Sequence, residues 1–324
     1  MTSLGIPTLR PPSRLPTWIG AWDRALYGEQ GFFRTHSPAD HFRTSVHAST
    51  LFAQAVARMT REAGLDTVVD IGAGRGELLV ALHALDPGLD LLGVEVAPRP
   101  ADLPEAVAWT AALPELVDGV VIANEWLDNV PCSVVEVDPD GVLRVVHVDP
   151  ASGAEELGLP VGHQQVPSYV GDWLAQWWPL DAAEPGTRAE VGASRDQAWQ
   201  SVVGRVTRGL AVAVDYGHTR DTRPPFGSLR SYVDGREVDV LPDGSRDVTA
   251  HVAVDSVAAA VDADVRRQRE VLRDLGVTAE RPPLDQATTD PPGYVRALSR
   301  ASEAAELTAE GGLGDFWWIV TTVG

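Results

Sequence analysis

The sequence predicts an α/β protein with a doubly wound, mostly parallel sheet, an antiparallel edge strand and a mostly helical insertion. Two observations predict the sheet: short β-branched runs alternate with helical patterns, and the first of these runs ends in closely spaced glycines. A third observation is the length, because 324 residues with 44% hydrophobic content can bury one large core and still carry an insertion.

Four segments are expected along the chain. Residues 1–40 contain prolines and aromatic residues and are expected to wrap the domain. Residues 41–150 are expected to form a ligand-binding core, and residues 151–205 a helical cap. Residues 206–324 are expected to complete the sheet and to supply elements on the substrate side.

The core segment alternates helices and strands. Apolar residues at helical spacing predict a helix from Pro38 to about Met59, and a second helix is expected over residues 77–85, before Asp86-Pro87-Gly88. The expected strands cover residues 68–71, 91–95, 106–110 and 119–123. This alternation is typical of parallel sheets covered by helices on both faces.

The second half departs from this simple alternation. Residues 134–148 alternate apolar and polar side chains around Pro139-Asp140-Gly141, which predicts a β-hairpin. Residues 210–216 restore a buried strand, and residues 316–323 predict an antiparallel strand at the edge of the sheet. The insertion carries tryptophans at helical spacing, which usually pack a core. They are Trp173, Trp177, Trp178 and Trp199.

A glycine-rich turn at residues 70–76 gives the clearest ligand signal. The sequence Asp70-Ile71-Gly72-Ala73-Gly74-Arg75-Gly76 follows a strand, and such turns expose backbone N–H groups to a ligand. A dinucleotide-binding turn would need a glycine where this chain has Glu77, whose carboxylate would repel a pyrophosphate. The acidic strand end suits the cationic amino-acid part of S-adenosylmethionine (SAM). A glycine-rich turn without a ligand is the alternative.

Glu95 supports the SAM interpretation. It ends the next expected strand at about the spacing of a ribose-binding carboxylate and is expected to accept both ribose hydroxyls. Leu113 lies in an apolar stretch where the adenine is expected. The expected cofactor contacts are Asp70, Gly72, Ala73, Gly74, Gly76, Glu95, Val96, Leu113, Asn124 and Glu125.

Several motifs together resemble the MidA-like family of SAM-dependent methyltransferases. They are the segments 69–76, 123–131 with the pattern N-E-x-x-D-x-x-P, 214–218 with D-Y-G-H, 227–232 and 247–252. The resemblance implies a Rossmann-like class I methyltransferase that modifies a protein arginine, as does the mitochondrial family member that assists respiratory complex I assembly. The chain departs from the family at Phe32, where the family has an acid.

Four residues at strand ends are expected to be catalytic. Glu125 and Asp128 lie three residues apart, so a helical turn would place both on one face, where they could grip a guanidinium. Because the guanidinium pKa lies above about 12, they would mainly orient it. Tyr216 could contact the substrate, and His218 could relay a proton. A turn-capping role for the acids and structural roles for Tyr216 and His218 are the alternatives.

Composition limits the remaining possibilities. A net charge of −20 disfavours nucleic acid, and a single cysteine excludes an intrachain disulfide. No signal peptide or membrane segment is visible, so a cytoplasmic protein is expected. The absence of lysine, with abundant Ala, Gly, Pro and Asp, indicates bacterial coding, and scattered histidines give no reason to expect a metal. The expected partner is a protein or a small molecule. A small-molecule O- or N-methyltransferase and a SAM-binding assembly factor without turnover are the rival functions, and the oligomeric state is not specified.

Overall fold

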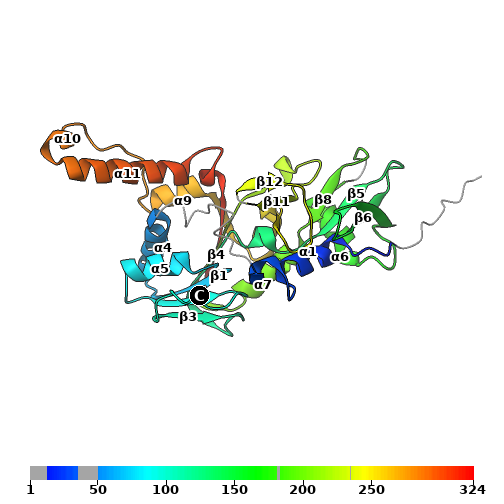
Figure 1. Cartoon of the computed structure of the whole chain (residues 1–324), viewed down its shortest axis with the longest axis horizontal. Helices are drawn as coiled ribbons and strands as arrows, with labels where there is room; N and C mark the ends of the chain where they lie inside the picture. The colour runs from blue at the N-terminus through cyan, green and yellow to red at the C-terminus, as the bar shows by residue number, and fades with distance from the viewer. Residues whose placement is uncertain (1–12, 36–49, 181–182, 234) are drawn as a thin grey trace, which may run out of the picture.

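The computed structural model describes residues 13–35, 50–180, 183–233 and 235–324 (Figure 1). Its main element is a seven-stranded sheet in the order β15-β16-β9-β4-β1-β2-β3. The strands are β1 Thr67–Ile71, β2 Asp90–Val94, β3 Val107–Thr110, β4 Val117–Asn124, β9 Val206–Asp215, β15 Asp264–Arg267 and β16 Trp317–Val323. The doubly wound α/β fold is confirmed.

The strand order creates a crevice at the carboxyl edge of the sheet. Neighbouring strands from β3 to β9 run parallel, and the order reverses between β1 and β4, where such sheets bind ligands. β16 pairs antiparallel with β9, as expected, but its expected place at the edge is wrong because β15 pairs along its outer side. β15 was not predicted because it is short and carries Arg266 and Arg267, a polar composition that suits edge strands.

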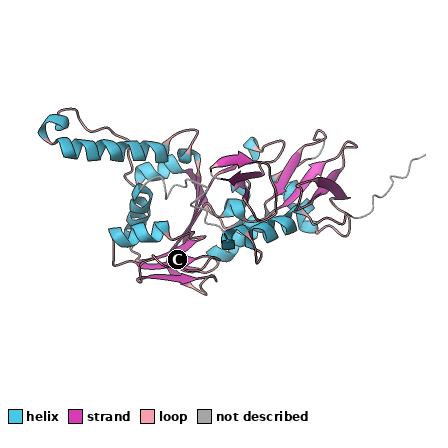
Figure 2. Ribbon diagram, viewed as in Figure 1, coloured by secondary structure: helices cyan, strands magenta, loops and turns pink. Residues whose placement is uncertain are grey.

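Helices cover both faces of this sheet. Alternate strand residues point to opposite faces, so Val68 packs with α4 (Thr50–Glu62) and α5 (Glu77–Leu85), and Val69 packs on the other side. The face of Val68 is also covered by α9 (Gln268–Asp274) and α11 (Pro291–Thr308), and that of Val69 by α7 (Ala193–Val203) and α8 (Val254–Ala260). The expected helix up to Met59 corresponds to α4, and residues 36–49 lie outside the described residues. Figure 2 shows α11 and the short α10 (Gln286–Thr289) extending away from the sheet.

A second lobe surrounds the hairpin. The hairpin is confirmed as β5 (Ser133–Val137) and β6 (Leu143–Val148), and it pairs with β7 (Glu155–Pro160) and β8 (Arg188–Val191) in a four-stranded sheet. Helix α1 (Trp18–Tyr27) packs on one face of this sheet, and α6 (Ser168–Trp177) packs on the other. Segment 151–205 was expected to be a helical cap, and it contains two helices, α6 and α7, together with two strands that the tryptophan spacing did not indicate.

Two small sheets join the lobes. One contains β11 (Arg230–Val233), β12 (Arg236–Val238) and β13 (Asp247–Thr249), and the other pairs β10 (Gly217–His218) with β14 (Val252–Ala253). The remaining elements are α2 (Phe32–Thr35) and the 3-10 helices Leu127–Asn129, Arg220–Thr222 and Leu313–Asp315. Among the described residues, no helix combines the length and apolar character needed to cross a bilayer.

Candidate active site

The glycine-rich turn follows β1 and leads into α5. Gly72, Gly74 and Gly76 have φ values of +70°, +57° and +81°, in the left-handed region that favours glycine. A Cβ atom at Gly72 would also lie 2.7 Å from Cδ1 of Trp126. The turn therefore depends on glycine both for its backbone conformation and for its close contact with the indole.

Glu95 follows β2 and braces this turn. Its Oε2 accepts the backbone N–H of Gly74 at 3.1 Å, and its Oε1 accepts the N–H of Ala97 at 3.1 Å. Burial raises the pKa of this carboxyl, and the backbone hydrogen bonds oppose the rise. Each carboxylate oxygen has a second acceptor direction, so these contacts leave Glu95 able to bind a hydroxyl.

A cavity of about 410 Å³ runs beside the turn. Its volume lies in the range of small-molecule sites, which is about 300–1,000 Å³. Asp70 ends β1 on its wall, where burial raises the pKa of its carboxyl well above the usual value and the charges of Glu77 and Glu95 add to the rise. This gathering of acids favours a cationic ligand.

Asn124 and Glu125 line the cavity at the end of β4. Glu125 has a φ of +51°, which is uncommon for a residue with a side chain, and its N–H donates to the carbonyl of Val214 at 2.8 Å. Asn124 Nδ2 donates to Glu125 Oε1 at 3.2 Å. Oδ1 of Asn124 is buried and has no hydrogen-bond partner among the described residues, so it is positioned to accept a ligand hydrogen bond.

Asp128 lies in the 3-10 turn that follows Glu125. Its Oδ2 accepts a hydrogen bond from the hydroxyl of Thr249 at 2.6 Å and a second from the hydroxyl of Tyr216. Its Oδ1 is buried and has no partner within the described part of the chain. Burial raises the pKa of the carboxyl, and the bonds from Thr249 and Tyr216 oppose the rise. One oxygen is thus fixed by protein donors, and the other is available to a ligand.

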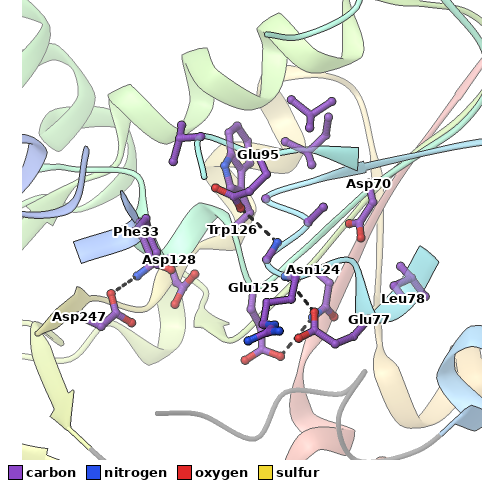
Figure 3. Close-up of a pocket in the computed structure, with 18 of the residues that line it drawn as sticks. Phe33, Asp70, Glu77, Leu78, Glu95, Asn124, Glu125, Trp126, Asp128 and Asp247 are labelled. Atoms are coloured by element: carbon purple, nitrogen blue, oxygen red, sulfur yellow. Dashed lines mark hydrogen bonds between the residues drawn. The ribbon is translucent and has the colours of Figure 1, made fainter. Parts of the chain in front are cut away.

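Asp247, at the start of β13, brings another carboxylate to the same cavity (Figure 3). Asn129 Nδ2 donates to its Oδ1 at 2.9 Å. Burial, followed by the charge of Asp128, raises the pKa of Asp247 to about 8. This carboxyl therefore holds a proton near neutral pH, next to an acid that has several donors to stabilise its charge.

Aromatic side chains complete the wall around these acids. Tyr27 from α1, Phe33 from α2 and Tyr232 from β11 line the cavity. The rings of Tyr27 and Phe33 lie 5.5 Å apart, and the Tyr27 hydroxyl donates to the carbonyl of Asn129 at 3.3 Å. This part of the cavity combines negative charge with ring faces and edges.

Comparison of the sequence with known protein families identifies the family of this chain. A protein family described as "Putative S-adenosyl-L-methionine-dependent methyltransferase" matches residues 90–271, which is more than half of the chain. The chain belongs to this methyltransferase family. No protein with a curated description matches it.

Two solved structures from Burkholderia thailandensis share the fold of this methyltransferase. One, described as a "likely methyl transferase" and bound to S-adenosyl-homocysteine, is 24% identical with a TM-score of 0.73, and the alignment covers 95% of this chain and 88% of that chain. The other, an uncharacterized protein of the same superfamily, is 26% identical with a TM-score of 0.74, and the alignment covers 95% of this chain and 87% of that chain.

The residues of the methyltransferase site fit SAM, the cofactor of its class. The buried, unpartnered Oδ1 of Asn124 and the acids Asp70 and Glu95 suit a ligand that carries an ammonium and a sulfonium. Apolar side chains line the same cavity and suit the adenine. They are Ile71, Leu78, Val94, Val96 and Leu113.

Most of the residues expected from the sequence meet in this cavity. All of the expected cofactor contacts line it except Gly76, which instead sits at the N-terminus of α5. Of the four expected catalytic residues, Glu125, Asp128 and Tyr216 line it, but His218 does not.

His218 lies in a separate, buried cluster. Its Nδ1 accepts a hydrogen bond from Arg223 Nη1 at 2.7 Å, and its ring packs edge-on against Trp178. Burial and the nearby positive charge of Arg223 lower its pKa to about 3, so the imidazole stays neutral across the physiological range. This geometry gives a structural role to His218 and offers it no contact with the cavity.

Several lining residues were not predicted as site residues. Tyr27, Phe33, Asn129, Tyr232 and Asp247 come from separate parts of the chain and meet only in the folded protein. Asn129, Tyr232 and Asp247 lie in motifs shared with the resembled family, and those motifs were their only clue. No group of His, Cys, Asp and Glu side chains arranged to hold a metal ion occurs in the part of the chain that the structure describes.

Proposed function

We propose that this methyltransferase transfers a methyl group from SAM to a nitrogen atom of an arginine side chain in a protein substrate. The observation that supports the proposal is the group of three carboxylates that share one cavity with the glycine-rich turn: Glu125, Asp128 and Asp247. Several aromatic rings line the same cavity, and three of them belong to this group. This acceptor region, as we call these acids with Tyr27, Phe33 and Tyr232, suits a planar cation.

A guanidinium matches this acceptor region better than a neutral acceptor does. It presents five N–H donors in one plane, and carboxylates accept them in pairs. The ring faces of tyrosine and phenylalanine attract a cation that lies over them. A neutral hydroxyl acceptor would leave the charge of the acids uncompensated in a largely buried site.

The chain's own residues would bind and orient this acceptor. When bound, SAM supplies an electrophilic methyl group on a sulfonium. Asp128 Oδ1 and Glu125 accept N–H groups of the guanidinium, and Tyr216 and Thr249 keep Oδ2 of Asp128 in place. The guanidinium enters as a cation, so its nitrogen must give up one proton with the transfer. We assign this proton to the Asp128 carboxylate, because Asp247 in the same cavity already holds a proton near neutral pH.

The position of the tryptophans also supports a protein substrate. A closed aromatic cap over the cavity would favour a small acceptor. None of Trp173, Trp177, Trp178 and Trp199 is among the described residues that line the cavity, and their side chains pack in the cores of the two lobes instead.

The test uses SAM labelled with tritium in its methyl group. The protein is incubated with cell extract, and the acid-precipitated protein is hydrolysed and analysed for methylarginine. We expect label in methylarginine, and we expect Glu125→Gln to lower it by about 100-fold, the usual cost of removing one charge-stabilising group. Label confined to the acid-soluble fraction would support a small-molecule acceptor and contradict the proposal. SAM affinity, measured by calorimetry for both proteins, separates loss of transfer from loss of cofactor binding.

A further inference from the structure

We infer that Arg195 is a positioning residue for the acceptor region, because it fastens the turn that carries Asp128 to the loop that follows β13. Arg195 does not line the cavity, and nothing in the sequence pattern distinguishes it from a surface arginine in the first turn of a helix. The inference rests on the proposed role of Asp128 and does not require the acceptor to be an arginine.

The guanidinium of Arg195 bonds to two separate segments. Its Nη2 donates to the carbonyl of Asp128 at 2.6 Å, and its Nε donates to the carbonyl of Val130 at 3.1 Å. Its Nη1 donates to the carbonyls of Ala250 at 3.0 Å and His251 at 2.8 Å. Four carbonyl acceptors thus engage all three of its nitrogen atoms.

Burying the charged guanidinium of Arg195 costs free energy. Arg195 is 1% exposed, and no ion pair joins it to a carboxylate among the described residues. It also lies in the first turn of α7, where the helix dipole disfavours a positive charge. An apolar side chain would avoid both costs. The hydrogen bonds to four carbonyls are therefore the main interactions that offset the cost of burying the charge. Two of these carbonyls lie in the segment that carries Asp128, and two lie in the segment that follows Thr249.

A carboxylate holds the same turn from its other side. Oδ2 of Asp215 accepts the N–H groups of Leu127 at 3.0 Å and Asp128 at 3.2 Å. The turn is therefore bound at its N–H groups by the carboxyl of Asp215 and at its carbonyls by the guanidinium of Arg195. These contacts fix the backbone on both sides of the Asp128 side chain, so the unpartnered Oδ1 has a defined position.

Arg195 also affects the acid electrostatically. Burial raises the pKa of Asp128, and the positive charge of Arg195 acts with the bonds from Thr249 and Tyr216 to oppose that rise. The same charge opposes the rise that burial causes in the pKa of Asp215. Removing the charge is expected to displace the turn and to favour the neutral form of both acids.

The test compares two analogues of SAM and needs no acceptor. In sinefungin an amine-bearing carbon replaces the methyl-bearing sulfonium, whereas S-adenosyl-homocysteine has a neutral sulfur at that position. Calorimetry gives the ratio of the two affinities, and this ratio reports the negative charge that faces the methyl position. We expect Arg195→Met to lower the preference for sinefungin by about tenfold, as loss of one charge-assisted contact does. Affinity for S-adenosyl-homocysteine should change little.

Four further variants decide the interpretation. Arg195→Lys keeps the charge and part of the donor set, so it should recover much of the preference, whereas a packing role would make it no better than Arg195→Met. Asp128→Asn should lower the preference similarly, and adding Arg195→Met to it should have little further effect. Arg223→Met is the control, because the Arg223 side chain is only 8% exposed but binds Asp255, His218 and Trp177 instead.

Hydrogen exchange measured by mass spectrometry provides an independent readout. In Arg195→Met the segments 124–131 and 247–252 should exchange faster, while β1 and β2 keep their protection. An unchanged preference in folded Arg195→Met, when Asp128→Asn lowers it, overturns the inference. If Asp128→Asn also leaves the preference unchanged, the proposed role of Asp128 fails, and the exchange rates alone decide whether Arg195 positions the turn. Unchanged exchange then overturns the inference as well.

Discussion

At the scale of single residues, Glu125 combines a cavity-facing carboxylate with a strained backbone. Its φ of +51° lies in the left-handed region, which costs a residue with a side chain about 1 kcal/mol or more. The hydrogen bond from its N–H to Val214 O holds the residue in this conformation. Strain of this kind is tolerated where the side chain serves a purpose that another residue type cannot serve.

Replacing Glu125 with glycine should therefore separate stability from activity. We expect Glu125→Gly to raise the free energy of unfolding by about 1 kcal/mol, because glycine adopts positive φ without strain, and to abolish methyl transfer. Asp262→Gly is the matched control, since Asp262 also has a φ of +51° but does not line the cavity. It should gain similar stability and keep full transfer. Urea unfolding and the tritium assay measure both quantities, and a destabilised Glu125→Gly protein would contradict the strain argument.

Asp247 should make the stability of the protein depend on pH. Its pKa is about 8 in the folded protein against an ordinary value of 3.8, so the folded state keeps a proton that the unfolded chain loses. The resulting stabilisation is fully present below about pH 4 and is lost as the pH rises to about 8, by at most about 1.4 kcal/mol per pH unit.

Asp247→Asn removes this contribution while it keeps the shape of the side chain. We expect the variant to become more stable relative to wild type as the pH rises from 5 to 9. Urea unfolding at several pH values measures the difference between the two free energies of unfolding. Asp66→Asn, at an exposed position, should leave the pH dependence as it is in wild type. Parallel pH curves for wild type and Asp247→Asn would show that Asp247 titrates normally.

At the scale of elements, we expect the β1 turn to bind the cofactor through its backbone, so its shape should matter more than its side chains. Gly72→Ala should lower SAM affinity by at least about tenfold, because the new Cβ would lie 2.7 Å from Trp126 Cδ1 and the φ of +70° disfavours any side chain. Calorimetry with SAM measures the effect.

Gly64 provides a close control for the backbone cost. It has a φ of +68°, but a Cβ atom there would meet nothing within 4 Å. Gly64→Ala should lose stability of about 1 kcal/mol and keep SAM affinity within about twofold, as expected for a distant site. Equal affinities for the Gly72→Ala and wild-type proteins would exclude the turn from cofactor binding.

At the scale of the whole molecule, the two ends of the site are built differently. The glycine-rich turn, Glu95 and Leu113 come from one continuous part of the chain, whereas the acceptor region joins α1, the Asp128 turn and β13. Helix α1 reaches β13 through Trp22, whose Nε1 donates to the carbonyl of Val248 at 2.8 Å. We therefore expect acceptor binding, but not SAM binding, to depend on this contact between distant segments of the chain.

Trp22→Ala tests this division. Trp22 is fully buried, so its truncation should cost about 3–5 kcal/mol of stability. Below the melting temperature we expect methyl transfer to fall strongly, because Tyr27 and Phe33 follow Trp22 on the same segment, while SAM affinity stays within about twofold. Trp22→Phe keeps a ring and should have milder effects. An equal loss of SAM affinity and transfer would contradict the division.

The same division explains what the sequence could predict. The cofactor end depends on a strand, a glycine turn and an acid in close succession, and such local patterns have a direct physical meaning. The acceptor region depends on which distant segments converge, and no local pattern specifies that. Asp247 and Tyr27 illustrate this, because each belongs to a short element whose neighbours are set by tertiary packing. His218 differs from these residues, because a strand-end position predicted a site residue, but the chain turns after Asp215 and places the imidazole beside Arg223, away from the lining of the cavity.

The bond between Trp22 and Val248 also has a consequence for biosynthesis. These residues are 226 positions apart, and at about 5–20 residues per second the ribosome needs roughly 10–45 s to synthesise the chain between them. During that interval α1 can pack only on elements already made, and part of its apolar face has no final partner. The nascent chain is therefore expected to need protection from aggregation, and it acquires a complete acceptor region only after β13 has left the ribosomal tunnel.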